Sequence, residues 1–294
     1  MTIFVTGASG FVASHLVPML IAKHYPVTAL IRSKDEKFFK KAKVVVGDLA
    51  KKGTWQEKLK DHDVLIHLAA EISSKTKRDF IKNNVRATEN LIVAAKKARI
   101  KKIILFSSAA VTSIRQDWYA QTKKTQEELI LASKIPYVIL RPSMIYGPGD
   151  TKNIGWLIGI IKKLPIIPLP GGGHFGRQPV YVGDICKIVI KLLEGRYQNK
   201  IFEIHGKEYV EMSKMVKVIT DKLGQFKIVI PIPLFTIVAF FYLAQRVFTS
   251  PKFTVDQIKS LISGEKFTGD AWWETFDIIP TSFESGVSKM IKGE

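Results

Sequence analysis

Short apolar runs rich in β-branched residues recur along the first half of the chain, and amphipathic segments separate several of them. Continuous apolar runs predict buried strands, and apolar positions repeating about every three to four residues predict helices. Apolar strands that alternate with helices are typical of a parallel sheet covered on both faces. The pattern therefore predicts a doubly wound α/β fold. The predicted strands are residues 3–5, 27–31, 44–46, 64–68, 103–106 and 138–140, and the predicted helices are residues 15–24, 84–98 and 123–132.

The pattern loosens after residue 141 into turns rich in glycine and proline, which surround an apolar helix predicted at residues 154–164. An apolar run at residues 179–182 and a helical pattern up to residue 193 then return the chain to the sheet. The predicted division is a sheet domain of residues 1–150 and about 178–200, and a smaller lobe of residues 151–177 and 201–294.

Residues 228–247 form an apolar segment of that lobe, and basic residues flank it. A membrane-spanning helix needs about 20 apolar residues, and Pro231 and Pro233 shorten the usable helix to about residues 234–247. We interpret the segment as a buried helix or a helix at an oligomer interface. A helix that lies in the membrane surface and makes peripheral contact, or a membrane span, are the alternatives.

The composition sets further limits. The chain has 294 residues, of which 46% are hydrophobic, so it can bury a large core. A single cysteine, Cys186, excludes an internal disulfide and a thiolate metal site, and the six histidines show no metal-ligand spacing, so no metal is expected. The chain begins in a predicted strand, without a basic and apolar leader. We expect a cytoplasmic protein, with a peripheral position at the inner face of the membrane as the alternative.

The charge is strongly basic, with 45 Lys and Arg against 26 Asp and Glu, a formal net charge of +19. Such a balance favours anionic partners such as nucleotides, nucleotide-linked substrates or anionic lipid. The lysines stand in short scattered groups without a recognisable nucleic-acid module. We therefore expect a solvated lysine-rich face, a small-molecule substrate and no nucleic-acid partner.

A glycine-rich turn lies between the first predicted strand and the first predicted helix and reads Gly7-Ala8-Ser9-Gly10-Phe11-Val12-Ala13. Gly7 can take backbone angles that other residues rarely adopt, and Gly10 lets the main chain approach a pyrophosphate closely. The small side chain of Ala13 lets the helix pack on the strand. Because a helix N-terminus offers free N–H groups and a positive dipole end, this turn predicts a dinucleotide site.

A second motif supplies candidate chemistry. Tyr119 and Lys123 are four residues apart, so on a helix they lie one turn apart on the same face. A phenol with a pKa of about 10 is a poor base, and we expect the lysine cation to lower that pKa. Tyr119 would then exchange a proton with a substrate oxygen, and Lys123 could also bind the ribose of a nicotinamide cofactor. Ser108, at the end of the strand at residues 103–106, could hold the same substrate oxygen.

Together these motifs resemble the extended short-chain dehydrogenase/reductase family, or NAD-dependent epimerase/dehydratase family, over essentially the whole chain. The resemblance implies a Rossmann-type sheet with a smaller C-terminal substrate lobe. Members commonly pair through helices that correspond here to residues 84–98 and 123–132, which implies a homodimer. The matching segments are residues 6–11, 47–49, 67–70, 84–91, 107–111, 141–149, 177–184 and 280–286.

The resemblance also implies roles for individual residues. The cofactor contacts that it implies, besides Tyr119 and Lys123, are Gly7, Ser9, Gly10, Phe11, Val12, Asp48, Leu49, Leu68, Ala69, Ala70, Pro142 and Ser143. The substrate contacts that it implies are Asn84, Ser108 and Arg177, the last of which would reach a substrate diphosphate.

The cofactor preference can be argued from the end of the second strand. An acidic residue there normally binds the ribose 2′-hydroxyl of NAD, whereas this chain has Arg32, whose guanidinium suits a phosphate. We therefore predict a preference for NADP, with NAD as the alternative because Asp35 lies close by.

The predicted function is an NAD(P)-dependent oxidoreductase or epimerase that acts on a hydroxyl or keto carbon, with a nucleotide-diphosphate sugar as substrate. Two features of this chain depart from the pattern of the sugar epimerases and point to a different substrate. Ser108 and Tyr119 are only 11 residues apart, where sugar epimerases have a longer loop, and the apolar segment at residues 228–244 favours a lipid-like substrate. The segment also resembles a branch related to sterol or lipid oxidoreductases and a complex I accessory subunit. The alternative function is a membrane-associated accessory protein that binds cofactor without turnover.

Overall fold

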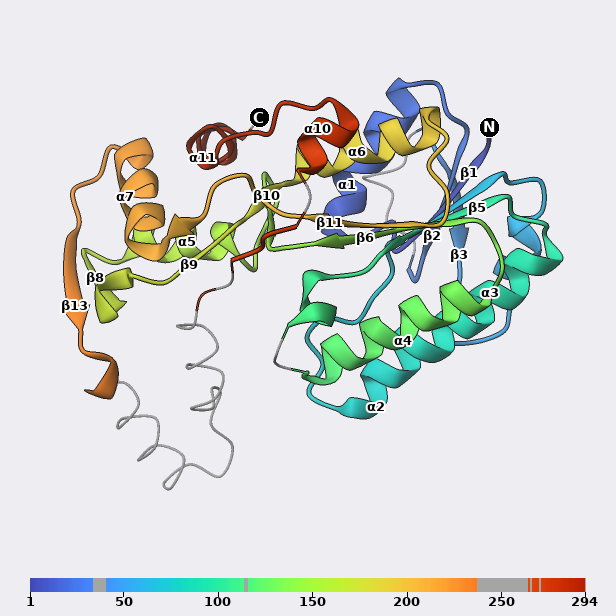
Figure 1. Ribbon diagram of the computed structural model, residues 1–294, viewed down its shortest axis with the longest axis horizontal. Coiled ribbons are helices and arrows are strands. Elements are labelled where there is room, and N and C mark those ends of the chain that lie inside the picture. The colour runs from blue at the N-terminus through green and yellow to red at the C-terminus, as the bar shows by residue number, and fades with distance from the viewer. Residues whose placement is uncertain (34–40, 114–115, 237–263, 265, 270, 294) are drawn as a thin grey trace. The chain divides into compact units, whose positions relative to one another are not determined.

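The computed structural model describes residues 1–33, 41–113, 116–236, 264, 266–269 and 271–293 (Figure 1). The chain divides into two compact units. The first, here called the sheet unit, comprises Met1–Ser143, Val182–Ile204 and Asp270–Ile278. The second unit comprises Met144–Tyr181, His205–Gly269 and Ile279–Glu294.

The sheet unit contains a seven-stranded sheet in the order β11-β6-β5-β4-β1-β2-β3, with every neighbouring pair parallel. The continuous apolar runs explain why most of its strands are buried along their whole length. This sheet confirms the predicted doubly wound α/β fold. The strands are β1 (Ile3–Thr6), β2 (Val27–Ile31), β3 (Lys43–Val46), β4 (Val64–His67), β5 (Lys102–Phe106), β6 (Tyr137–Pro142) and β11 (Lys200–Ile204).

Helices cover both faces of this sheet (Figure 1). On one face α1 (Phe11–Ala22) packs beside α6 (Val182–Glu194), and α10 (Trp272–Phe276) contacts β11. The other face carries α3 (Ala87–Lys97) and α4 (Trp118–Ala132). Buried side chains such as Phe4, Leu65 and Leu91 fill the core between this face and α3. The remaining elements are η1 (Thr54–Leu59), α2 (Lys77–Phe80), the π-helical turn η2 (Ile81–Arg86) and η3 (Ala109–Thr112).

The second unit has short paired strands and three helices among its described residues. β7 (Ile145–Tyr146) pairs with β10 (Val180–Tyr181), β9 (Gly176–Arg177) with β12 (Val210–Glu211), and β8 (Ile166–Pro170) with β13 (Ile228–Ile232). A core around Tyr146, Ile161 and Ile219 holds the unit together. The helices are α5 (Ile154–Lys163), α7 (Met212–Leu223) and α11 (Phe283–Lys292), and a short turn, η4 (Gly171–Gly173), follows β8.

The apolar segment at residues 228–247 begins with a strand, while residues 234–236, where the usable helix was expected to start, are helical. Ile228–Ile232 form the strand β13, which runs parallel to β8 from Ile228 opposite Ile166 onward. Pro231 disfavours a helix here, and β-branched residues suit an edge strand. The side chains at 228–230 are exposed rather than buried. Residues 237–247 lie outside the described part of the chain. Within the described residues, no helix is both long and apolar enough to cross a membrane.

The compact units also differ from the predicted division of the chain. β11 was expected in the substrate lobe but pairs with β6 at the edge of the main sheet. Residues 271–278 join it, because the ring of Phe276 in α10 contacts the rings of Phe202 and Tyr197. These contacts join segments that are far apart in the sequence, so a local sequence pattern does not predict them.

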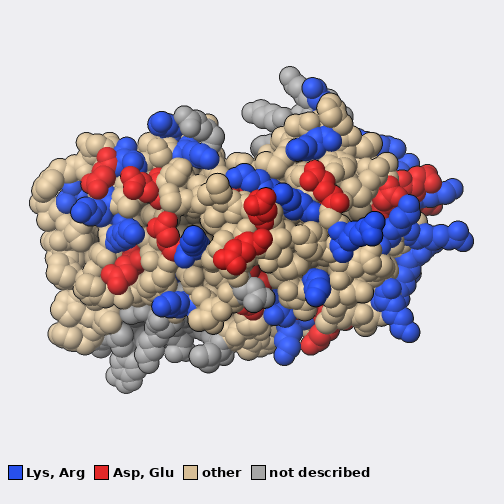
Figure 2. Space-filling model, turned by 45° about the horizontal axis from the view of Figure 1, so that its top comes forward, with Lys and Arg blue, Asp and Glu red and all other residues tan. Residues whose placement is uncertain are grey.

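Basic side chains are spread over the face of the molecule seen in Figure 2, with acidic side chains between them. This distribution agrees with the expected solvated, lysine-rich surface.

Candidate functional site

The glycine-rich turn joins β1 to α1 in the predicted way. Gly7 has φ of +66°, and a Cβ at that position would lie 2.5 Å from the backbone nitrogen of Ala69. Only glycine fits both the conformation and the space. The Gly10 amide donates to the Gly7 oxygen at 3.0 Å, and α1 begins at the next residue without a side-chain cap. Ala13, 1% exposed, packs the helix closely.

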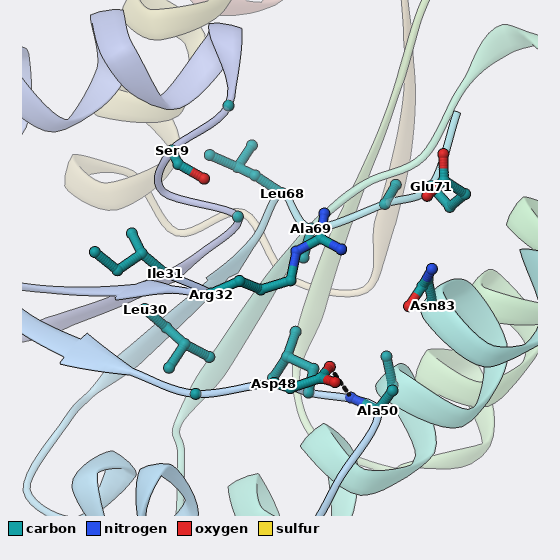
Figure 3. A pocket seen from close by; sticks show the side chains of 16 residues that line it. Ser9, Leu30, Ile31, Arg32, Asp48, Ala50, Leu68, Ala69, Glu71 and Asn83 are labelled. Atoms are coloured by element: carbon teal, nitrogen blue, oxygen red, sulfur yellow. Dashed lines mark hydrogen bonds between the residues drawn. The ribbon is translucent and has the colours of Figure 1, made fainter. Parts of the chain in front are cut away.

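A pocket opens beside this turn, at the carboxyl ends of β1, β2, β3 and β4 (Figure 3). Ligands of open α/β sheets bind at this edge. Nine of the residues expected at the cofactor line it: Gly7, Ser9, Gly10, Arg32, Asp48, Leu49, Leu68, Ala69 and Ala70. Seven further lining residues were not expected: Leu30, Ile31, Gly47, Ala50, Glu71, Asn83 and Ala87. The turns that follow the second, third and fourth strands could have suggested Ile31, Gly47 and Glu71.

Three charged residues line this pocket. Figure 3 shows the Arg32 side chain reaching into the pocket from the end of β2. The Asp48 carboxylate accepts a hydrogen bond from the Ala50 amide at 2.9 Å, which holds it in its own turn. The Glu71 carboxylate likewise accepts from the amides of Ile72 and Ser73, both at 3.1 Å. The acidic side chains are therefore fixed by backbone amides.

Six residues expected at the cofactor do not line the pocket, and two of them, Tyr119 and Lys123, belong to α4 (Trp118–Ala132). Phe11 and Val12 lie in the first turn of α1, while Pro142 ends β6. The Ser143 amide donates to the Ile204 oxygen at 2.9 Å. Cofactor contacts by these six residues remain predictions.

The candidate catalytic residues come from β5 and α4. Ser108 follows β5 and starts η3, where its Oγ accepts from the Ala110 amide at 3.2 Å. Asp117 caps α4 through the Ala120 amide at 2.8 Å, so the helix begins one residue before Tyr119. The side chains of Ser108 and Tyr119 lie close enough together for the Ser108 hydroxyl to favour the ionised phenol.

The pKa of Tyr119 shifts in the direction opposite to the one expected. Burial raises the pKa of the phenol, the Ser108 hydroxyl opposes this rise, and the Asp117 carboxylate adds to it. Burial penalises the charged phenolate. Tyr119 is therefore held in its protonated form.

Lys123 is almost completely enclosed, with 1% of its surface exposed. Its Nζ donates to the Phe106 oxygen at 2.6 Å, which links α4 to the end of β5. Burial lowers the pKa of Lys123 to about 7, and the Glu127 carboxylate raises it. Glu127 lies one turn further along α4, is 4% exposed, and accepts two hydrogen bonds from Arg141.

Asn84 is placed differently from the prediction that it contacts substrate. It lies in the π-helical turn η2 and is fully buried. Its Oδ1 accepts from the Glu71 amide at 2.7 Å, and its Nδ2 donates to the Glu71 oxygen and to Thr122 Oγ1 at 3.1 and 3.0 Å. With its amide satisfied inside the protein, Asn84 joins a pocket-lining loop to α4.

His67 is a packed core residue. Its Nδ1 lies 2.7 Å from Thr6 Oγ1 and its Nε2 lies 3.0 Å from Thr88 Oγ1. Burial, and to a lesser extent the Lys123 cation, lower its pKa to about 3, so the ring is neutral. In the described part of the chain, no group of three His, Cys, Asp or Glu side chains could hold a metal ion.

Arg177 belongs to the second unit. It lies in β9, opposite Val210 of β12, and its Nη1 donates to the Gly176 oxygen at 3.1 Å. Its contact with a substrate diphosphate remains a prediction.

The geometry of the glycine turn, the pocket and the serine–tyrosine pair agrees with a comparison of sequences. Residues 3–204 match the family described as the NAD dependent epimerase/dehydratase family. The chain belongs to this family. The expected resemblance is thereby confirmed, and the NAD dependence in the family's description agrees with a dinucleotide pocket.

Individual members of the epimerase/dehydratase family show the range of its chemistry. A Stigmatella aurantiaca protein named 4-hydroxy-2-methyl-3-oxo-4-farnesyl-3,4-dihydroquinoline-1-oxide ketoreductase is 27% identical, over 76% of this chain and 74% of its own length. A putative UDP-glucose 4-epimerase of Methanocaldococcus jannaschii is 30% identical, over 76% and 82%. Both relatives carry the names of enzymes.

A solved structure shares the fold. MoeE5 in complex with UDP-glucose and NAD superposes with a TM-score of 0.79, covering 100% of this chain and 98% of MoeE5, at 20% sequence identity. At this identity the likeness supports the fold, and the Rossmann-type architecture is confirmed.

Proposed function

We propose that this protein is an NAD(P)-dependent oxidoreductase or epimerase that acts at a hydroxyl- or keto-bearing carbon, with Tyr119 as its acid and base. The observation that carries the proposal is the pairing of Tyr119 with Ser108 in the same unit as the cofactor pocket. A hydroxyl pair beside a dinucleotide site can hold one oxygen and exchange its proton.

The residues of the pocket fit a dinucleotide. At Gly7 a Cβ would collide with the backbone of Ala69, so glycine is required for the turn to pass close to the chain after β4. The uncapped N-terminus of α1 offers N–H groups to phosphate oxygens. Leu30, Ile31 and Leu49 supply apolar surface beside them. When bound, the cofactor supplies or accepts a hydride at its nicotinamide ring.

The proton steps follow from the state of Tyr119. Because burial keeps its phenol protonated, Tyr119 is ready to donate that proton to a carbonyl oxygen as the carbonyl carbon gains a hydride. In the reverse direction the phenolate takes the proton back from the hydroxyl. Ser108 holds the same oxygen, and Lys123, anchored to the Phe106 carbonyl, sits one turn from Tyr119 to bind the ribose.

We propose NADP as the preferred form of the cofactor. Arg32 reaches into the pocket from the end of β2, where a 2′-phosphate would be recognised (Figure 3). Asp35, the nearby acidic residue that leaves NAD as the alternative cofactor, lies outside the described residues.

The proposed substrate is a nucleotide-diphosphate sugar. Arg177 occupies the family's diphosphate-contacting position in sequence, and the Methanocaldococcus jannaschii relative is named as a UDP-glucose epimerase. The second candidate is an apolar ketone. It is favoured by the name of the Stigmatella aurantiaca ketoreductase and by the exposed apolar side chains of β13.

Binding of the cofactor is tested first. NADPH and NADH are titrated into the protein and into Arg32→Ala, with intrinsic fluorescence as the readout. Loss of a charge-assisted contact should weaken NADPH binding by roughly 10- to 100-fold, while NADH binding should change little. If neither cofactor binds the parent protein, the proposal fails, and an accessory role without turnover is favoured instead.

Turnover is tested with Tyr119→Phe, which removes one hydroxyl, and with Tyr25→Phe as the matched control outside the pocket. UDP-sugars, 4-keto sugar nucleotides and apolar cyclic ketones serve as substrates. Tyr119→Phe should retain cofactor binding and lose at least about 100-fold in rate. Net consumption of reduced cofactor indicates a reductase, and isomerisation without net consumption indicates an epimerase.

A further inference from the structure

The strand β13 exposes apolar side chains on both of its sides. Ile228, Val229 and Ile230 are 52%, 44% and 44% exposed, although consecutive residues of a strand point in opposite directions. In the described part of the chain β13 has one neighbour, β8, so it forms the edge of a two-stranded ribbon. Apolar residues on both sides of an edge strand leave the ribbon without a packed face.

Aromatic residues lie at both ends of this strand. Phe226, two residues before β13, is 91% exposed, and Phe235, three residues after it, is 73% exposed. We call the exposed side chains of residues 226–235, together with Leu164 just before β8 and Ile166 at its start, the apolar ribbon. An exposed contiguous apolar surface of this kind marks an interaction site.

The segments that form the apolar ribbon carry basic but no acidic residues. Residues 152–170 and 222–236, which supply its two strands and the preceding helix ends, contain five lysines and no Asp or Glu. Lys162 and Lys163 end α5 and are exposed, and Lys227 lies directly before β13. Lys222 forms an ion pair with Glu284 at 2.7 Å. The binding partner of the apolar ribbon should therefore have both an apolar region and a negative charge.

We propose that the apolar ribbon docks on an anionic lipid surface. Phenylalanine and aliphatic side chains enter the boundary between headgroups and acyl chains, while lysines remain at the phosphate level. A second copy of this chain fits less well, because a two-fold interface would bring the same lysines of both copies together. The inference does not depend on catalysis, since every residue that carries it lies in the second unit.

Vesicle sedimentation of the full chain tests this inference. Vesicles of phosphatidylcholine alone are compared with vesicles containing about 30% phosphatidylglycerol. The protein should bind the anionic vesicles, and high salt or the double variant Lys162→Gln/Lys163→Gln should weaken that binding. No binding of the parent protein to anionic vesicles overturns the proposal, and so does equal binding to both vesicle types.

The double variant Phe226→Ser/Phe235→Ser should bind anionic vesicles at least about tenfold more weakly. Ile279→Ser is the matched control, because Ile279 is also 91% exposed and belongs to the connection between α10 and α11. Unchanged cofactor affinity confirms that each variant is folded. A different outcome is that the parent protein is a dimer in light scattering, the double variant is a monomer, and the parent does not bind vesicles. In that case the ribbon is an interface between copies and the proposal is wrong.

Discussion

Glu127 and Arg141 form a two-point ion pair directly behind the candidate catalytic lysine. Arg141 Nε donates to Glu127 Oε1 at 3.0 Å, and Arg141 Nη2 donates to Glu127 Oε2 at 2.7 Å. The pair joins α4 to β6, one helical turn from Lys123. A buried carboxylate fixed in this way is a constant negative charge that favours the protonated form of Lys123.

Glu127→Gln should therefore lower the pKa of Lys123, because the negative charge that raises it is gone. If protonated Lys123 supports turnover, the alkaline limb of the pH–rate profile moves to lower pH. Glu203→Gln is the control, since Glu203 lies 3.8 Å from Arg141 and is more exposed. Profiles that coincide for Glu127→Gln and the parent protein would contradict a positioning role for Glu127.

Gly7→Ala should abolish cofactor binding. The new Cβ would meet the Ala69 backbone at 2.5 Å, and the φ of +66° is strained for alanine. Gly159→Ala is a suitable control, because nothing lies within 4 Å of a Cβ in that position. Cofactor titration of both variants checks the prediction, and unchanged affinity of Gly7→Ala would show that the turn is not the phosphate site.

His67 should make the protein sensitive to acid. Its pKa falls from 6.5 to about 3 on folding, so between these values the unfolded state binds the proton and the folded state does not. The free energy of unfolding then decreases as the pH falls through this window, by at most about 1.4 kcal/mol per pH unit. Urea unfolding of the parent protein and His67→Gln at several pH values measures the slope, which should be smaller in the variant. Equal slopes would contradict the prediction.

Cys186 should be unreactive in the folded protein. It is fully buried, and burial raises the pKa of its thiol to about 12, so almost no thiolate forms at neutral pH. An aromatic disulfide reagent should label one thiol per chain in denaturant and react slowly without it. Rapid labelling of the native protein would mean that α6 opens readily.

Much of the sheet unit could be predicted because its signals are local. Strands such as β2 are apolar throughout, and the turn at Gly7 has a backbone requirement that glycine satisfies. The strand β11 was missed because its sequence, Lys-Ile-Phe-Glu-Ile, mixes charged with apolar residues and its place depends on β6. The strand at Ile228–Ile232 was not predicted, because apolar content alone does not separate a helix from an edge strand.

The same distinction applies to the candidate site: features that follow from the local sequence could be predicted, and features that depend on tertiary enclosure could not. Residues that follow strand ends, such as Arg32 and Asp48, could be placed at the pocket because parallel strands all end at one edge. The buried role of Asn84 and the rise in the pKa of Tyr119 depend on three-dimensional enclosure. Spacing along a helix shows which side chains share a face, and it does not show how much water reaches them.

The sheet unit is assembled from three separate stretches of the chain, the last of which ends at Ile278. During biosynthesis the first 143 residues leave the ribosome with β6 at an open edge, since β11 appears only with residues 200–204. Trp272 and Phe276, each 1% exposed in the finished protein, arrive still later. The nascent chain must therefore keep the β6 edge from aggregating until β11 has been made, and its core stays incomplete until residues 272–276 follow, which makes this protein a candidate for chaperone dependence during synthesis.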